Sequence, residues 1–236
     1  MIEEVAKLIK ESSKVVVICG KEVSDISGFP NIRSSTELFN GYAYSKIMGH
    51  DFLINEPEKF YDFFRKEILD KEYYPNRIHI FFAEMQKKKD ITVITENIDG
   101  LQKESGIIKL IELHGNVKKY YCINCFEEYS SKSIQYSNGV PKCMCGGIIR
   151  PSIILNGESI NGNELMKAAI AIQNADLVII CGNDLKIRST AYLLNFYYGE
   201  KIVQINKEEI EIKEFDNVSL IGNLEDSIGK LEEIIK

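Results

Sequence analysis

Seven short apolar runs recur along the chain and predict buried β-strands. Within each run the apolar residues are mostly consecutive, as in strands that are covered on both faces of a parallel sheet. Stretches with helical spacing precede the first run, lie between later ones, as at residues 163–174, and follow the last one, at residues 225–235. This alternation predicts an α/β fold with a doubly wound, Rossmann-like parallel sheet. The predicted strands cover residues 14–19, 91–95, 108–113, 152–156, 175–181, 201–206 and 217–222.

Four cysteines in a short polar segment form a Cys-x-x-Cys pair and a Cys-x-Cys pair. Two such turns bring four thiolates together around a tetrahedral zinc ion, and a segment this poor in core residues needs a staple to fold. The alternative is four free thiols in a loop. Four sulfurs complete the shell of a structural site, so that His114, eight residues before the first cysteine, is not required as a ligand. The predicted ligands are Cys122, Cys125, Cys143 and Cys145.

Two insertions interrupt the alternation of strands and helices. One is rich in Phe and Tyr, has no strand-like run and predicts a helical segment, and the other is the zinc-ribbon segment. We expect the two insertions to form a smaller domain beside the Rossmann-like one. The larger domain would take residues 1–34, 76–118 and 150–236, and the smaller one residues 35–75 and 119–149.

Composition and charge narrow the classes of function. The chain has 236 residues, of which 44% are hydrophobic, and this suits one large domain or one domain with a substantial insertion. No apolar run is long enough to cross a bilayer, and the amphipathic N-terminus does not resemble a signal peptide. We therefore expect a cytoplasmic protein with no membrane partner. The net charge of −6 and the scattered lysines argue against a nucleic-acid binder. Nothing in the sequence predicts an oligomeric state.

Glycines and polar residues follow several predicted strands, and in a doubly wound sheet they would meet in one crevice. After the first strand the chain reads CGKEVSDISGFPNIR, where Gly20 permits a turn and Arg33 is a candidate partner for a phosphate. Asn97 and Asp99 follow the second strand and offer an amide and a carboxylate. CGNDLKI and QIN follow two later strands. Taken alone, the glycine turn and the Asn-Ile-Asp-Gly stretch fit ordinary turns; together the segments predict a nucleotide site.

The order of these motifs resembles that of the sirtuins, NAD-dependent protein lysine deacylases, over nearly the whole chain. Residues 20–33 resemble the family's segment from Gly-Ala-Gly-Ile-Ser to Gly-Ile-Pro-Asp-Phe-Arg, and residues 96–99 resemble its Gln-Asn-Ile-Asp. His114 and Gly115 match its His-Gly, which the four cysteines follow. RPSIILNGE, at residues 150–158, resembles the strand against which the substrate peptide lies, and GNDL resembles the family's Gly-Thr-Ser.

The resemblance implies an enzyme that uses NAD as co-substrate and zinc as a structural ion. It would remove the acyl group from the lysine of a protein or peptide, and it would release nicotinamide and an O-acyl-ADP-ribose. His114 would be the general base, because imidazole exchanges protons near neutral pH. Asp99 would hold the nicotinamide carboxamide, and Asn97 the ribose or an ordered water. The implied cofactor-binding residues are Gly20, Lys21, Ser24, Ile32, Arg33, Glu96, Asn97, Asp99, Gly182, Asn183, Asp184, Asn206 and Leu224.

The chain departs from the family pattern at several of these positions. Glu22 stands in place of a glycine, Asp184 in place of a serine and Glu96 in place of a glutamine. Two added carboxylates near the phosphates, at Glu22 and Asp184, predict weaker NAD binding and reduced activity. Two alternatives therefore stay open: an enzyme that transfers ADP-ribose to a protein, and a catalytically weak sirtuin fold that serves as a binding protein. Outside the motifs, His79 is expected to be packed or on the surface.

Overall fold

A six-stranded sheet forms the larger lobe of the molecule, in a computed structural model that describes residues 1–32, 35–135, 137–186 and 188–235. The strands are β1 (Lys14–Cys19), β4 (Asp90–Thr95), β5 (Leu110–Glu112), β9 (Leu177–Cys181), β10 (Lys201–Asn206) and β11 (Asp216–Ile221). They lie in the order β11-β10-β9-β1-β4-β5, and each neighbouring pair is parallel. The predicted α/β fold with a doubly wound sheet is confirmed.

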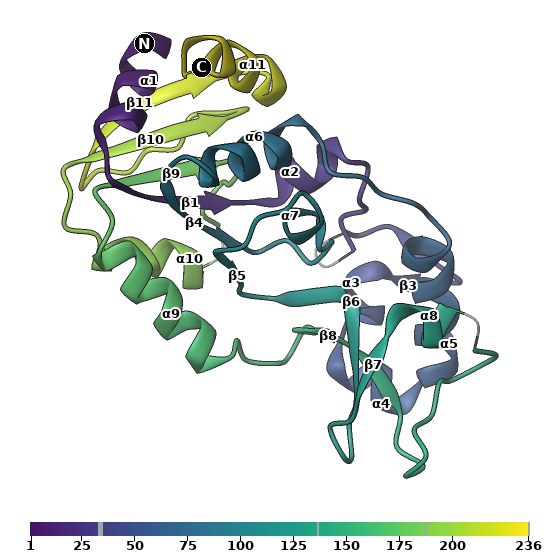
Figure 1. Cartoon of the computed structure of the whole chain (residues 1–236). Helices are drawn as coiled ribbons and strands as arrows, with labels where there is room; N and C mark the ends of the chain where they lie inside the picture. The colour runs from purple at the N-terminus through teal and green to yellow at the C-terminus, as the bar shows by residue number, and fades with distance from the viewer. Residues whose placement is uncertain (33–34, 136, 187, 236) are drawn as a thin grey trace.

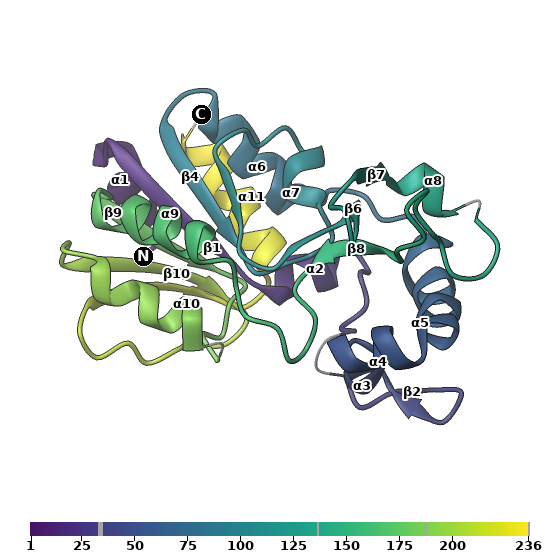
Figure 2. The same ribbon diagram turned by 90° about the horizontal axis from the view of Figure 1, so that it is seen from below.

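Helices cover both faces of this sheet, as Figures 1 and 2 show. They are α1 (Ile2–Glu11), α2 (Lys21–Ile26), α6 (Arg77–Gln86), α7 (Leu101–Glu104), α9 (Gly162–Gln173), α10 (Arg188–Leu193) and α11 (Leu224–Ile235). Val17 faces a core shared with α1, α6 and α11, whereas its neighbour Val16 faces a second core shared with α9. Both faces need apolar residues, which explains the unbroken apolar runs. In the described part of the chain, no helix has the length and apolar character needed to cross a bilayer.

The order of the strands reverses between β1 and β9, which makes this the topological switch point of the sheet. Cys19 and Cys181 are paired at the carboxyl ends of these two strands. The backbone N–H of Gly20 donates to Cys181 O over 3.0 Å. A Cβ on Gly20 would lie 2.5 Å from the Cα of Asn183, so only glycine fits there. The two strand-end loops therefore meet backbone to backbone at the place where doubly wound sheets bind ligands.

The smaller lobe, at the lower right of Figure 1, combines the two predicted insertions. Its elements are β2 (Leu38–Phe39), β3 (Tyr42–Ala43), α3 (Tyr44–Ile47), α4 (His50–Asn55), α5 (Pro57–Phe64), a π-helical turn (Arg65–Leu69), β6 (Gly115–Cys122), β7 (Glu128–Ser130), α8 (Ser131–Gln135) and β8 (Ile149–Ile153). Strands β7, β6 and β8 form an antiparallel sheet. Phe60, Tyr61, Phe63 and Phe64 are fully buried between this sheet and the helices. One aromatic core thus joins segments that are far apart in the sequence.

The structure corrects two local predictions. Residues 152–156 do not belong to the parallel sheet, because their first two residues end β8 and pair with β6. Their apolar side chains Ile153 and Leu155 face the aromatic core of the smaller lobe. An apolar run shows that a strand is buried but not in which sheet.

The second correction concerns residues 35–75, which contain the β2–β3 hairpin as well as helices. The division of the chain into domains stays a prediction.

His79 is packed inside the first turn of α6. The side chain of Asn76 accepts from the backbone N–H groups of Ile78 (3.0 Å) and His79 (3.4 Å). In return, Nδ1 of His79 accepts from the backbone N–H of Asn76 over 3.2 Å, which completes a capping box. The ring is therefore neutral and carries its proton on Nε2. Burial lowers the pKa of His79 to about 4.

We expect His79→Gln to make the fold less sensitive to acid. The folded-state pKa of about 4 lies below the ordinary 6.5, so the unfolded chain binds more protons between these values. Stability is therefore lost as the pH falls from 6.5 towards 4, by up to about 3 kcal/mol. Glutamine accepts the same Asn76 N–H without titrating. Urea unfolding at neutral pH and near pH 4 measures the loss.

The loss of stability should be smaller in His79→Gln than in the wild type. His50→Gln is the matched control, because the His50 side chain is 45% exposed. It should show the wild-type loss. Equal losses in all three proteins would contradict the assignment of acid sensitivity to His79.

Candidate active site and metal centre

The four predicted zinc ligands come together at one end of the smaller lobe. The Sγ atoms of Cys122 and Cys145, of Cys125 and Cys143, and of Cys125 and Cys145 are each 3.5 Å apart, and all four lie within 4.8 Å of one another. Tetrahedral Zn–S bonds of about 2.3 Å require sulfurs about 3.8 Å apart. Backbone N–H groups of Asn124 and Cys145 point at the sulfurs of Cys122 and Cys143. This donor set fits a structural zinc ion.

A cavity of about 500 Å³ lies beside the switch point, between the carboxyl ends of the strands and the smaller lobe. It holds His114 together with many of the predicted cofactor residues. A larger hollow of about 1160 Å³, lined by β6 and the segment after β8, contains none of those that the structure describes. The smaller cavity is therefore the candidate active site. Its lining includes Lys21, Ser24, Ile32, Glu96, Asn97, His114, Asn183 and Asp184.

His114 lies in the short connection between β5 and β6 and is 3% exposed. Its Nδ1 is 3.0 Å from the carbonyl oxygen of Glu96. Because a carbonyl only accepts, Nδ1 carries the proton and Nε2 holds the basic lone pair. Gly115 follows with φ +77°, and a Cβ there would lie 2.0 Å from Ser152 O. The carbonyl of His114 also accepts from Ile154 N over 2.9 Å. The backbone on both sides of the imidazole is thus fixed.

Asn97 and Asp99 hold the loop after β4 against the loop after β1. Nδ2 of Asn97 donates to Gly20 O over 2.8 Å. The carboxylate of Asp99 accepts from the Ser24 hydroxyl and, over 2.8 Å, from Leu101 N. Burial raises the pKa of Asp99, although both hydrogen bonds oppose the shift. A buried acceptor beside the cavity suits the amide of a ligand, but its contact with nicotinamide stays a prediction.

Asn206 supplies the observation that tests whether a dinucleotide fits. Its Oδ1 accepts from Asn183 N over 3.1 Å, whereas its Nδ2 is buried and has no hydrogen-bond partner among the residues that the structure describes. A ribose or phosphate oxygen would satisfy this donor. A second cavity of about 640 Å³, lined by Lys21 and Leu224 among others, adjoins the first at Lys21 and Asp25. A buried donor at the end of β10, together with two adjoining cavities at neighbouring strand ends, fits NAD.

The two added carboxylates, Glu22 and Asp184, differ in their surroundings. Oε2 of Glu22 accepts from Lys207 N over 3.3 Å at the second cavity. Asp184 lines the first cavity and pairs with Lys186, whose Nζ is 2.8 Å away. Burial raises the pKa of Asp184, but the hydrogen bonds and charge of Lys186 outweigh burial and leave the pKa lowered. Arg33, a predicted phosphate ligand, lies outside the described residues.

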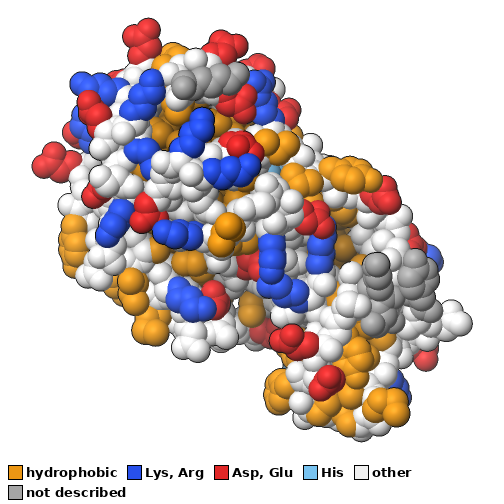
Figure 3. Space-filling model, viewed as in Figure 1, with side chains coloured by type: hydrophobic (Ala, Val, Ile, Leu, Met, Phe, Trp, Pro, Cys, Tyr) orange, Lys and Arg blue, Asp and Glu red, His pale blue; other side chains and the backbone are white. Residues whose placement is uncertain are grey.

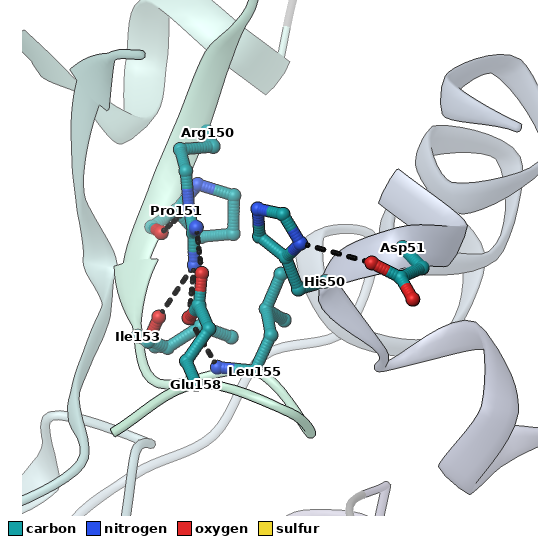
Figure 4. A network of polar contacts seen from close by, with 7 residues as sticks. All are labelled: His50, Asp51, Arg150, Pro151, Ile153, Leu155 and Glu158. Atoms are coloured by element: carbon teal, nitrogen blue, oxygen red, sulfur yellow. Dashed lines mark hydrogen bonds and ion pairs between the residues drawn. The ribbon is translucent and has the colours of Figure 1, made fainter. Parts of the chain in front are cut away.

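An ion pair that the sequence analysis did not find anchors the segment after β8. Figure 4 shows Arg150 and Glu158 joined by two contacts, one of them 2.9 Å long. Arg150 Nη2 also donates to Ile153 O (2.8 Å), and Glu158 Oε2 accepts from Leu155 N (2.7 Å). In the sequence, the opposite charges at the two ends of RPSIILNGE could have indicated this ion pair. The pair holds the end of β8 and the following turn, in which Asn156 lines the cavity.

The family model of the Sir2 family matches residues 20–189. The chain belongs to the Sir2 family. An NAD-dependent protein deacetylase of Clostridium perfringens is 35% identical over 238 residues, which cover 98% of this chain and 96% of that protein. One from Staphylococcus epidermidis is 32% identical over 241 residues, with 99% and 96% covered.

Solved structures of the Sir2 family agree along the whole chain. A Sir2 bound to an acetylated peptide superimposes with a TM-score of 0.86 at 30% identity and covers 100% of both chains. A Sir2 with a p53 peptide and NAD+ gives 0.84 at 31% identity and covers 99% of this chain and 98% of that one. The predicted membership of the sirtuin family is confirmed. The role of each site residue stays a prediction.

We expect purified protein to carry about one zinc ion per chain. Cys125→Ser should lower the zinc content well below one equivalent, because a hydroxyl is a poor substitute for a thiolate in this shell. Cys19→Ala is the control, since Cys19 is buried in β1 and should leave the zinc content unchanged. Elemental analysis after gel filtration measures the metal. Folded wild-type protein with far less than one zinc would refute the site.

Proposed function

We propose that this Sir2-family chain is an NAD-dependent protein lysine deacetylase or deacylase that releases nicotinamide and O-acyl-ADP-ribose. The observation that carries the proposal is the fixed imidazole of His114 in the cavity that borders the switch point. Its Nδ1 is committed to Glu96 O, so Nε2 is the nitrogen that accepts a proton. A base held in one tautomer beside a dinucleotide site suits proton removal from a ribose hydroxyl.

When bound, NAD would supply an electrophilic ribose carbon, from which nicotinamide would leave as the acyl oxygen of the substrate lysine bonds to it. Asn97 and Asp99 hold the loop that faces this carbon, since both bond to the loop after β1. The segment after β8, fastened by Arg150 and Glu158, forms the opposite wall. His114 Nε2 would take the proton of a ribose hydroxyl, so that this oxygen could bond to the acyl carbon. The loop after β4 and the segment after β8 would hold the acyl-lysine and the ribose between them, oriented for reaction.

The substrate class in this proposal is an acyl-lysine protein or peptide. The structural relatives are named for acetylated and propionylated peptides. We expect no nucleic-acid partner, because the net charge is −6 and Figure 3 shows basic and acidic side chains interspersed on the face it draws. A cytoplasmic location also belongs to the proposal, since none of the six cysteines, all of which lie in the described part of the chain, forms a disulfide, as in a reducing compartment.

The proposed domain division gives each insertion a place in this function. Residues 35–75 and 119–149 would form the smaller domain, with zinc as its staple, and the rest would form the NAD-binding domain. Support comes from the aromatic core, in which residues of α5 meet residues of β6 and β8. The zinc ion then stabilises the lobe that closes one side of the cavity and takes no part in proton transfer.

His114→Ala should lower deacetylation by about two to four powers of ten, because a positioned base is lost. Acetyl-lysine peptide, NAD and the full chain are incubated, and O-acetyl-ADP-ribose is followed by chromatography. His50→Ala is the matched control, since His50 lines the larger hollow and not the candidate active site. Zinc content and thermal unfolding should match the wild type in both variants. Wild-type turnover by His114→Ala would overturn the assignment of the base.

The second candidate function is that of a catalytically weak binding protein. The carboxylates of Glu22 and Asp184, which line the two cavities proposed for NAD, favour it. Asp184→Asn should tighten NAD binding roughly fivefold at low salt, because it removes about 1 kcal/mol of repulsion and releases Lys186 for a phosphate. Glu22→Gln should change binding less, since the Glu22 carboxylate already accepts from Lys207 N. Calorimetric titration measures both, with exposed Glu84→Gln as control. A larger gain from Glu22→Gln would reverse this ranking.

A further inference from the structure

The candidate active site has a polar side and an apolar side. The strand ends supply the polar side, which suits a dinucleotide, through Asn97 and Asn183 among others. Phe29, Ile32 and Ile98 supply the apolar side, and all three also belong to the aromatic core of the smaller lobe. The acyl chain is the apolar part of the proposed substrate, so we expect it to lie against these three side chains.

Asn156 adds a polar group to the wall along which the substrate is proposed to lie. Of residues 150–158, it is the one that lines this cavity. Leu155 before it is buried in the aromatic core, and Gly157 after it lines the larger hollow. An acyl-lysine side chain that enters the cavity along this wall therefore passes Asn156.

Three hydrogen bonds fix Asn156 to the junction of α3 and α4. Its backbone N–H donates to Met48 O over 2.9 Å, and its carbonyl accepts from the backbone N–H of His50 over 3.0 Å. Its side-chain Nδ2 donates to Ser45 O over 2.7 Å. Figure 4 shows one side of this junction, where His50 lies beside Leu155. The first insertion thereby holds both the backbone and the amide of Asn156 in place.

The carbonyl of Ser45 determines the orientation of this amide. A carbonyl only accepts, so Nδ2 is the amide atom that faces Ser45, and Asn156 cannot turn aside without breaking that bond. Both residues are half-buried, so the groups left behind would find water only in part. Loss of such a bond lowers the affinity of whatever displaces the amide by roughly 10-fold.

We propose that Asn156 is a specificity-determining residue that restricts this enzyme to short acyl groups. The proposal rests on the deacylase function proposed above. An acetyl group ends next to the lysine nitrogen and leaves the amide in place, whereas a hexanoyl chain has to displace it. Displacement breaks the bond to Ser45 and sets methylene groups against a polar side chain. The penalty falls on binding of the acyl chain and not on proton transfer at His114.

The test compares peptides of one sequence that carry acetyl-, butyryl- or hexanoyl-lysine, with the full chain and saturating NAD. Chromatography follows the release of nicotinamide, which is common to all three. The wild type should have a kcat/KM for hexanoyl-lysine roughly 10-fold below that for acetyl-lysine. Asn156→Ala makes room, so it should raise the ratio of hexanoyl- to acetyl-lysine kcat/KM by about 10-fold, mainly through KM.

Two further variants separate the amide from the space that it fills. Asn156→Leu keeps a side chain of similar size that makes no bond to Ser45 and packs against methylene groups. It should also raise the ratio, though less than Asn156→Ala. Asn161→Ala is the matched control and should leave the ratio unchanged, because Asn161 caps α9 in the same connection and lines the larger hollow.

Three kinetic outcomes overturn the proposal. Equal kcat/KM values of the wild type for acetyl- and hexanoyl-lysine leave nothing for Asn156 to restrict. A loss by one factor for all three peptides in Asn156→Ala, with the ratio unchanged, shows that Asn156 only holds the wall. A wild-type ratio in Asn156→Leu assigns the restriction to size and not to the hydrogen-bonded amide.

Calorimetric titration with the same peptides distinguishes this proposal from the deacylase function, because binding needs no turnover. The wild type should bind acetyl-lysine more tightly than hexanoyl-lysine, and Asn156→Ala should lose this preference. A wild type that releases no nicotinamide but shows this pattern of binding overturns the deacylase function alone. Turnover without the pattern overturns the role of Asn156 alone. A wild type that neither binds nor turns over any of the peptides overturns both.

Discussion

The close approach of two strand-end loops at the switch point is the constraint on which the rest of the site depends. Gly20 touches Asn183 with no room for a side chain, and Asn97 donates to the carbonyl of Gly20. The loops after β1, β4 and β9 are thereby locked to one another. The polar side chains of these three loops are positioned from this contact, because their own backbone takes part in it.

The stretch of chain around His114 ties the smaller lobe to the same point. His114 and Gly115 lead from β5 of the parallel sheet into β6 of the antiparallel sheet. The carbonyl of His114 accepts from the backbone N–H of Ile154, just beyond β8. The start of β6 and the end of β8 therefore both lie beside His114. The aromatic core and the zinc cysteines hold these strands at their far end. The position of the imidazole therefore depends on packing in both lobes.

Charge in the cavity is arranged around this imidazole. Glu96 supplies a carbonyl to one ring nitrogen and a carboxylate to the cavity. Asp184 is partly neutralised by Lys186, and Glu22 faces a backbone N–H at the neighbouring cavity. Three carboxylates that look alike in the sequence thus have three different surroundings. The carboxylates of Glu96 and Asp184 line the same cavity as His114, whereas that of Glu22 lies at the neighbouring cavity.

The sequence by itself determined what depends on local pattern. Apolar runs marked six strands of the parallel sheet, and cysteine spacing marked the zinc ligands. The order of the strand-end motifs indicated a sirtuin with His114 as its base. These signals are readable because strand burial, metal-binding turns and glycine turns each involve a few neighbouring residues.

Only the tertiary structure decided which distant groups meet. It assigned residues 152–156 to the smaller sheet, paired Arg150 with Glu158, and set Thr190 against Glu96, 94 positions away. These contacts depend on the order of the strands and on the approach of loops at the switch point. No local pattern encodes that approach, because burial and hydrogen bonding select it among all the ways in which the same elements could pack.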